Sequence, residues 1–252
     1  MTLQQPHEDR LYQDPELARF YDLENGFAAD HAFCMQLAQN ASSVLDLGCG
    51  TGELAARLAD KRRVVGVDPA AAMLAVARQR PGGDKVRWIT ATAQAVRLGE
   101  TFDLIVLTGH AFQVFLSEAD QRAALKTIAM HLSPAGRFIF DMRNPQAREW
   151  LEWSPEASVR HVEHEQLGAV TAWNEATHDP ATSIVTYKTF YMQKSTGRTW
   201  SARSQIRFTG KDLLAALIDE AGLVVETWHG DWTGAPCTQA SPDFIPLGRL
   251  KP

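Results

Sequence analysis

The chain has few cysteines, no run of basic residues and no long apolar stretch, and each lack excludes a class of protein. Three cysteines, Cys34, Cys49 and Cys237, are too few and wrongly spaced for a disulfide framework or a zinc site, so we expect free thiols. The 25 Lys and Arg residues against 30 Asp and Glu leave a net charge of -5, which argues against a nucleic-acid partner. No apolar stretch approaches the roughly 18 residues that cross a bilayer, and the first ten residues lack the apolar core of a signal peptide. We therefore expect a cytoplasmic protein with neither a membrane nor a nucleic acid as partner.

What the chain does contain, between residues 44 and 141, is an alternation of short β-rich runs with helical patterns. The runs are SVLDL, RVVGV, VRWIT, FDLIVL and GRFIFD. Their mostly apolar and β-branched residues suit strands that are covered on both faces. This alternation predicts an α/β fold with a parallel sheet and right-handed crossovers. Ser117 or Asp120 is expected to cap the helix before SPAG, and Pro69 stands where a helix can start.

The pattern changes over residues 145–208, where polar and apolar residues alternate and turn residues recur at QLG, HDPA and KSTG. Such a segment is typical of an antiparallel meander. The apolar stripe with Tyr187 and Tyr191 predicts either a cap over an active site or a half-buried sheet face. The neighbouring strand turns three polar residues to its other side, namely Arg203, Gln205 and Arg207. A helix that ends at Gly222 follows, and SPDFIPLGRL predicts a last strand at the sheet.

Three glycines stand where the first strand gives way to a helix, in VLDLGCGTGELAARLA, residues 44–59. Ligands of parallel sheets bind beyond the carboxyl ends of the strands. Gly48, Gly50 and Gly52 let this turn bend tightly and leave no Cβ between backbone and ligand. The helix that follows offers unpaired N–H groups. We therefore expect a ligand with an acceptor or an anionic group against this turn.

Two ligand classes use such a turn. A dinucleotide needs G-x-G-x-x-G/A, which Gly50, Gly52 and Ala55 match. In that register Asp46 would repel a pyrophosphate, whereas a carboxylate at this position suits a ligand with an ammonium group. Asp68 ends the second strand, where it can accept hydrogen bonds from two ribose hydroxyls. A ribose at one end and an amino acid at the other describe S-adenosylmethionine.

Three motifs in the order VLDLGCGTGELA, VVGVDPAAAMLAVAR and FDLIVLTGHAFQVF resemble the class I S-adenosylmethionine-dependent methyltransferases. ARFYDLENGF and TGHAF are similar to small-molecule members, in particular sugar N-methyltransferases and glycine N-methyltransferase-like enzymes. The resemblance implies a doubly wound, Rossmann-like, mostly parallel sheet of seven strands. We expect one domain, with lid helices in 1–40, a cofactor-binding core in 41–144, an antiparallel cap in 145–208, and a helix and strands in 209–252.

The resemblance also implies which residues hold the methionyl part of S-adenosylmethionine. Thr108 would face its ammonium through the backbone, and Tyr21 would face its carboxylate from the lid. The other residues implied for this part are Asp46, Gly48, Cys49, Gly50 and Gly52.

The same resemblance implies an adenosine site at the second and third strands. Asp68 would bind the ribose, with Pro69 and Met73 at the edges of the slot. The family commonly has an acid after the third strand, but this chain has TATAQA there. Adenine recognition would therefore fall to Thr92, the Ala93 N–H or Gln94.

His110 is the candidate general base, because it follows the fourth strand, where the methyl group should lie. A hydroxyl acceptor needs a base within about 3 Å of its proton, whereas a neutral amine does not; a packing role is the alternative reading. Arg143 and Asn144 follow the fifth strand and are predicted as either substrate contacts or turn residues. Alternation puts His161 and His164 on opposite strand faces, so we predict no metal.

The sequence thus favours methyl transfer to a nitrogen or oxygen atom of a small molecule. Two alternatives stay open at this point. One is a nicotinamide-dependent oxidoreductase on a related sheet, and the other is a non-catalytic protein that binds the cofactor.

Overall fold

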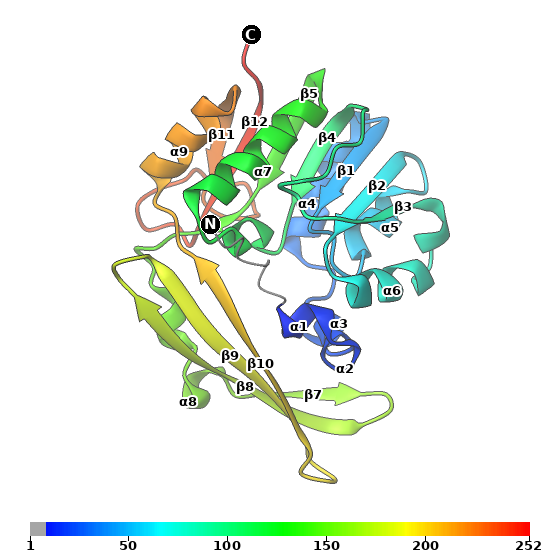
Figure 1. Cartoon of the computed structure of the whole chain (residues 1–252), viewed down its shortest axis with the longest axis vertical. Coiled ribbons are helices and arrows are strands. Elements are labelled where there is room, and N and C mark those ends of the chain that lie inside the picture. Colours follow the sequence, from blue (N-terminus) through cyan, green and yellow to red (C-terminus); the bar gives the residue numbers. More distant parts are fainter. Residues whose placement is uncertain (1–8) are drawn as a thin grey trace, which may run out of the picture.

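The structure is a computed structural model, and it describes residues 9–252. The centre of its main sheet is parallel and consists of β1 (Ser43–Leu47), β2 (Arg63–Asp68), β3 (Arg87–Thr90), β4 (Phe102–Leu107) and β5 (Leu132–Phe140). Two antiparallel strands, β11 (Leu223–His229) and β12 (Asp243–Leu250), complete the order β11-β12-β5-β4-β1-β2-β3, and the short β6 (Met142–Arg143) pairs with β12 (Figure 1). The predicted mostly parallel sheet is confirmed, and the predicted last strand, β12, lies inside it between β11 and β5.

Helices cover both faces of this sheet. Buried side chains of α4 (Ala29–Leu37) and α5 (Glu53–Leu58) form a core on one face, and those of α7 (Glu118–His131) and α9 (Lys211–Glu220) form a core on the other. A further helix, α6 (Ala71–Gln79), contacts β2 and β3. All five residues of β1 are buried, as expected for a strand between two helical layers.

Local signals set the ends of these helices. The Ser117 hydroxyl accepts from the Asp120 N–H at 3.1 Å and caps α7, so the first of the two predicted caps is the right one. Gly222 follows α9 with a φ of 80°, as predicted. Pro69 precedes α6 by two residues instead of opening it.

The order of the strands reverses at β1, because β2 and β3 lie on one side of it and β4 and β5 on the other. In doubly wound sheets the ligand crevice opens at this point, outside the carboxyl ends of the strands. The turn after β1 and the η3 segment (Ala111–Val114) after β4 therefore face the same crevice.

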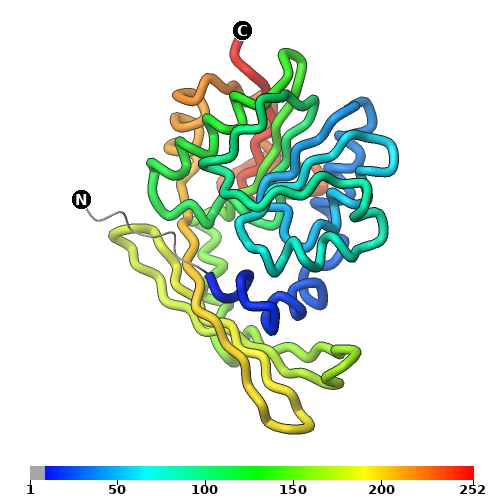
Figure 2. Tube along the Cα trace, turned by 45° about the vertical axis from the view of Figure 1, so that its right-hand side comes forward, coloured from blue at the N-terminus to red at the C-terminus, as the bar shows by residue number. Residues whose placement is uncertain are grey.

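The predicted lid covers residues 1–40, of which 1–8 lie outside the described residues. Its later part contains α4, which packs on the main sheet, so only the three short helices before α4 are called the lid from here on. They are α1 (Arg10–Gln13), α2 (Pro15–Ala18) and α3 (Tyr21–Glu24). Figures 1 and 2 show them between the main sheet with its helices and a second sheet.

The second sheet is an antiparallel meander in the order β10-β9-β8-β7. Its strands are β7 (Arg160–His164), β8 (Gly168–Asp179), β9 (Ile184–Gln193) and β10 (Thr199–Arg207). The prediction of a meander over residues 145–208 was wrong for the first part of that segment. This part contains the helical segments η4 (Glu149–Glu152) and α8 (Pro155–Ser158). Ser154 accepts from the Ala157 N–H at 3.2 Å and Pro155 opens α8, so a serine cap before proline decided this segment.

The remaining short 3-10 segments are η1 (Ala38–Asn40) and η2 (Gly83–Lys85). Cys34, Cys49 and Cys237 are free thiols, as predicted. Within residues 9–252, no helix has the length and apolar character that crossing a membrane requires.

Candidate active site

A cleft of about 350 Å³ opens at the carboxyl ends of β1, β4 and β5. This volume lies within the roughly 300–1,000 Å³ that small-molecule sites occupy. Of the cofactor and catalytic residues predicted from the sequence, it is lined by Tyr21, Asp46, Gly48, Cys49, Thr108 and His110. The other predicted residues lie outside its lining and are Gly50, Gly52, Asp68, Pro69, Met73, Thr92, Ala93 and Gln94.

Asp46 is a buried carboxylate in the cleft wall with no partner. Asp46 is the penultimate residue of β1, next to the glycine turn, and it is 2% exposed. No hydrogen bond or ion pair from the described residues reaches it. Burial and the nearby Asp68 carboxylate raise the pKa of Asp46 to about 7. A buried carboxylate is costly unless it is paired, so this one suits a cationic ligand.

The glycine turn is held against β2 by its own amides. Gly48 and Cys49 donate to the Val67 carbonyl at 2.7 and 3.1 Å, and Gly50 donates to Asp68 Oδ2 at 2.9 Å. A Cβ on Gly48 would lie 2.9 Å from the Ala111 side chain. Only glycine therefore lets the turn after β1 approach the segment after β4 this closely.

Asp68 holds the glycine turn and is the first residue of the predicted adenosine site. Its Oδ1 accepts from the Ala70 N–H at 2.8 Å, while Oδ2 accepts from Gly50. Each carboxylate oxygen has a second lone pair, so these bonds leave acceptor capacity for hydroxyl groups. Burial raises the pKa of Asp68, and the two backbone N–H groups oppose that shift.

The ring of Tyr21 joins the two halves of the predicted cofactor site. A Cβ on Gly50 would meet Tyr21 Cε1 at 3.7 Å and Met73 Cε at 3.6 Å, and a Cβ on Gly109 would meet the Tyr21 hydroxyl at 3.8 Å. Burial raises the pKa of Tyr21, which keeps its phenol neutral. The lid thus places an aromatic ring over the glycine turn.

The remaining predicted adenosine residues follow β2 and β3. Pro69 is exposed, and its carbonyl accepts from Gln13 Nε2 of the lid at 3.2 Å. Ala93 is 8% exposed and belongs to the core, while the Thr92 carbonyl accepts from two backbone amides of its own turn. Gln94 is half-buried beside them.

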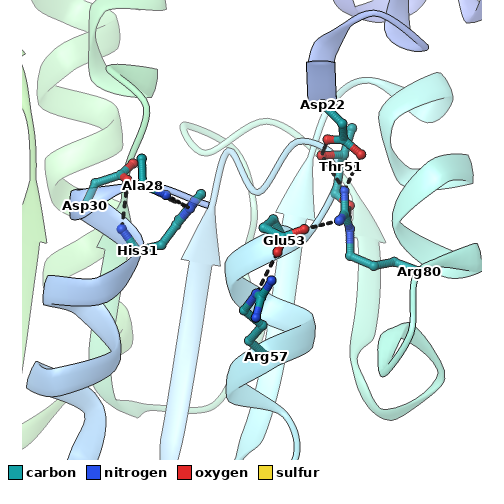
Figure 3. A network of polar contacts seen from close by, with 8 residues as sticks. All are labelled: Asp22, Ala28, Asp30, His31, Thr51, Glu53, Arg57 and Arg80. Carbon is teal, nitrogen blue, oxygen red and sulfur yellow. Dashed lines mark hydrogen bonds and ion pairs between the residues drawn. The ribbon is translucent and has the colours of Figure 1, made fainter. Parts of the chain in front are cut away.

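A polar network, which the sequence did not reveal, ties the lid to the glycine turn. Arg80, after α6, pairs with both Asp22 of α3 and Glu53 of α5, and its Nε donates to the Thr51 carbonyl at 2.9 Å (Figure 3). The Thr51 hydroxyl donates to Asp22 Oδ1 at 2.5 Å. One arginine thereby joins three segments that are distant in the sequence.

His110 lies between two carboxylates that the sequence did not single out. Its Nε2 is 3.0 Å from Asp243 Oδ1 and 3.7 Å from Asp141 Oδ2. Asp141 is 1% exposed, and burial raises its pKa although the imidazole opposes the shift. Asp141 follows directly after β5. The rule that ligand sites lie at the carboxyl ends of parallel strands could therefore have identified it from the sequence. No sequence signal identified Asp243, because it lies 133 residues after His110.

The two candidate substrate residues after β5 behave differently. Arg143 lines the cleft, with its guanidinium held by Glu149 and Gln113 at 2.9 Å each. Asn144 is 1% exposed and its amide donates to the carbonyls of Gln239 and Ser241. Asn144 is therefore a turn residue.

The tyrosine stripe of the second sheet faces the lid helices rather than the cleft. Tyr191 donates to Glu24 Oε2 at 2.6 Å, and the Tyr187 and Tyr12 hydroxyls lie 3.3 Å apart. Arg203, Gln205 and Arg207 point to the opposite face, as predicted. In residues 9–252 no group of three or more His, Cys, Asp or Glu side chains is arranged to hold a metal ion.

Comparisons with known proteins show what this sequence and this fold are similar to. Residues 44–136 match the family described as "Methyltransferase domain". The cypemycin N-terminal methyltransferase of a Streptomyces species is 26% identical over 210 residues, 81% of each chain. An S-adenosylmethionine-dependent methyltransferase of Clostridium acetobutylicum has a similar structure, with a TM-score of 0.77 at 17% identity over 94% of this chain and 98% of that one. A sugar N-methyltransferase of Streptoalloteichus gives a TM-score of 0.75 at 20% identity over 100% and 98%.

Proposed function

Because this chain is a class I S-adenosylmethionine-dependent methyltransferase of the small-molecule type, we propose that it methylates a nitrogen or oxygen atom of its acceptor. The family match decides against the nicotinamide-dependent oxidoreductase and the non-catalytic protein that the sequence left open. The observation that carries the proposal is the unpartnered, buried Asp46 carboxylate beside the glycine turn.

These residues fit S-adenosylmethionine, which supplies an electrophilic methyl group on a sulfonium when it is bound. Asp46 offers a carboxylate for its ammonium, and Asp68 offers free lone pairs for its ribose hydroxyls. Tyr21 adds an aromatic face, which favours a sulfonium by about 0.5–2 kcal/mol. Gly48, Gly50 and Gly52 keep side chains out of the space between turn and ligand. The adenine would be recognised by Thr92, the Ala93 N–H or Gln94.

The charge of the cleft favours an amine acceptor over a hydroxyl. Its lining carries five carboxylates and one guanidinium. The guanidinium, on Arg143, is already paired with Glu149. Two of the carboxylates are compensated by arginines outside the lining, Glu24 by Arg160 and Glu53 by Arg80. The other three leave a surplus of negative charge from which an ammonium ion gains, whereas an alcohol gains nothing. The five carboxylates belong to Glu24, Asp30, Asp46, Glu53 and Asp141.

His110 is the base in this proposal. It lines the cleft at the carboxyl end of β4, next to Thr108, where the methyl group of a ligand seated on the glycine turn would point. An amine that arrives protonated must lose a proton before its lone pair can react, and an imidazole can take it. The cap in 145–208 would act from a distance, through the lid helices that it contacts.

The test is methyl transfer from radiolabelled S-adenosylmethionine to a panel of small amines and matched alcohols. We expect binding of S-adenosylmethionine by calorimetry, and faster labelling of amines than of alcohols. The Asp68→Ala variant should bind roughly 10–100-fold more weakly, while Asp60→Ala, an exposed acid outside the cleft, should bind normally. Failure of the wild-type protein to label any amine or alcohol would overturn the proposal.

A further inference from the structure

His110 is fixed at two separate points, by the carboxylate of Asp141 between β5 and β6 and by that of Asp243 in β12. Its backbone N–H donates to Asp141 Oδ1 at 2.9 Å, and its ring Nε2 lies 3.0 Å from Asp243 Oδ1. The residue has a φ of 59°, in the left-handed region that only a few per cent of non-glycine residues adopt. The bond from its amide to Asp141 stabilises this backbone conformation.

Asp141 makes no hydrogen bond to the His110 ring. Its Oδ1 takes the His110 amide, and its Oδ2 accepts from the Trp232 indole at 3.3 Å. The 3.7 Å between that Oδ2 and Nε2 of His110 is too long for a hydrogen bond. The ring therefore has Asp243 as its hydrogen-bond partner.

Asp243 is itself held firmly at the start of β12. Its N–H donates to the Gly230 carbonyl at 3.2 Å, and its backbone lies opposite that of Arg143 in the antiparallel pairing of β12 with β6. Its side chain is 15% exposed, so little water competes for the carboxylate. The antiparallel end of the main sheet thus delivers a carboxylate to the loop after β4.

A carboxylate accepts hydrogen bonds and donates none, so the ring nitrogen that faces it must carry the hydrogen. This places the proton on Nε2 and leaves the lone pair of neutral His110 on Nδ1. We propose that Asp243 is a positioning residue that sets this tautomer, so that Nδ1 of His110 accepts the proton lost by the methyl acceptor. The proposal rests on the base role given to His110 above.

The proton and electron balance is complete without a further reactant. The acceptor's N–H or O–H proton passes to Nδ1 of His110. The lone pair left on the acceptor forms the new bond to the methyl carbon, and the electron pair of the broken C–S bond stays on sulfur. His110 ends as an imidazolium beside Asp141 and Asp243 and returns its proton to water.

Nitrogen NMR of the full chain with labelled histidine tests the tautomer without any substrate. The His110 signals are assigned by their absence in His110→Gln and recorded at alkaline pH. We expect an unprotonated Nδ1 and a protonated Nε2 in the wild type, a mixture of tautomers in Asp243→Asn, whose amide can also donate, and the wild-type pattern in Asp243→Glu. Asp219→Asn, which removes an exposed acid paired with Lys251, is the matched control. A protonated Nδ1 in the wild type, or no change in Asp243→Asn, would overturn the inference.

Kinetics then separate this inference from the proposed function. In Asp243→Asn we expect kcat to fall about 100-fold, the lower range of general-base effects, with the KM for S-adenosylmethionine unchanged and activity partly restored in Asp243→Glu. Wild-type kcat in Asp243→Asn would refute the positioning role alone. A wild-type protein with the expected tautomer that methylates no amine or alcohol would refute the proposed function alone.

Discussion

The ring of Phe20 lies stacked on the ring of Tyr191, with centroids 4.2 Å apart and planes 9° from parallel. Phe20 follows the lid helix α2, and Tyr191 belongs to β9 of the second sheet. The second sheet therefore supports the lid from behind, and through the lid it bears on Tyr21 and the glycine turn. Its tyrosine face does not line the cleft.

Removing the Phe20 ring should loosen the lid and weaken cofactor binding. Phe20 is 0% exposed, so Phe20→Ala should lower the free energy of unfolding by about 3–5 kcal/mol. S-adenosylmethionine affinity should fall with it. Phe27→Ala, at a ring that is 45% exposed, is the control and should cost under about 1 kcal/mol. Equal losses in the two variants, by chemical denaturation, would mean that Phe20 does not anchor the lid.

The Arg80 network should contribute to affinity because it joins the lid to the glycine turn. The Arg80 side chain is 17% exposed, and Arg80→Met leaves Asp22 and Glu53 without this partner. We expect S-adenosylmethionine binding to weaken about 5–10-fold, equivalent to about 1–1.4 kcal/mol, the range of a single hydrogen bond. Arg57→Met is the control, since Arg57 is 51% exposed and pairs with Glu53 from within the same helix. Equal affinities of the two variants for S-adenosylmethionine, measured by calorimetry, would contradict a role of Arg80 in joining the lid to the glycine turn.

Asp46 should make stability fall as pH rises through the weakly acid range. Its pKa of about 7 in the folded protein exceeds the roughly 3.9 of an unfolded chain. Between pH 4 and pH 7 the folded state therefore keeps a proton that the unfolded state has released. The contribution of this group to the free energy of unfolding decreases over that window. Asp46→Asn should flatten this part of the curve in denaturant titrations, and an unaltered slope would refute the shift.

The same group should make cofactor affinity rise with pH. A ligand ammonium binds the ionised Asp46, so at pH 6 only about a tenth of the protein is in the competent form. We expect S-adenosylmethionine to bind roughly 10-fold more tightly at pH 8 than at pH 6. In Asp46→Asn the affinity should be low at both values, and calorimetry in this variant that reproduces the wild-type trend would assign the effect elsewhere.

Gly52 should tolerate no side chain, for a reason beyond its backbone angle. Gly52 and Gly99 both have a left-handed φ, 76° and 69°. A Cβ on Gly52 would lie 2.3 Å from Trp88 Cη2, whereas one on Gly99 meets nothing within 4 Å. Gly99→Ala should cost about 1–2 kcal/mol, and Gly52→Ala about 1–3 kcal/mol more. Similar thermal unfolding of the two would show that Trp88 simply moves aside.

The spacing of apolar and turn residues along the chain was enough to predict most of the main sheet and its helices. Runs such as SVLDL and FDLIVL predict buried strands because both faces must be apolar between two helical layers. The positions of Gly48, Asp46 and Asp68 at strand ends then follow from the direction of a parallel sheet. The helix at Pro155 was missed because the alternation around it outweighed the serine-proline cap in our interpretation.

The sequence by itself determined the parallel core and the glycine turn, because strand length, alternation and turn chemistry act between residues close along the chain. The tertiary structure alone decided that Asp243 meets His110, that Arg80 joins Asp22 to Glu53, and that Phe20 stacks on Tyr191. These pairs come from segments whose spacing carries no periodic signal. Only the packing of β12 beside β5, and of the lid against β9 and α6, brings their side chains within contact distance.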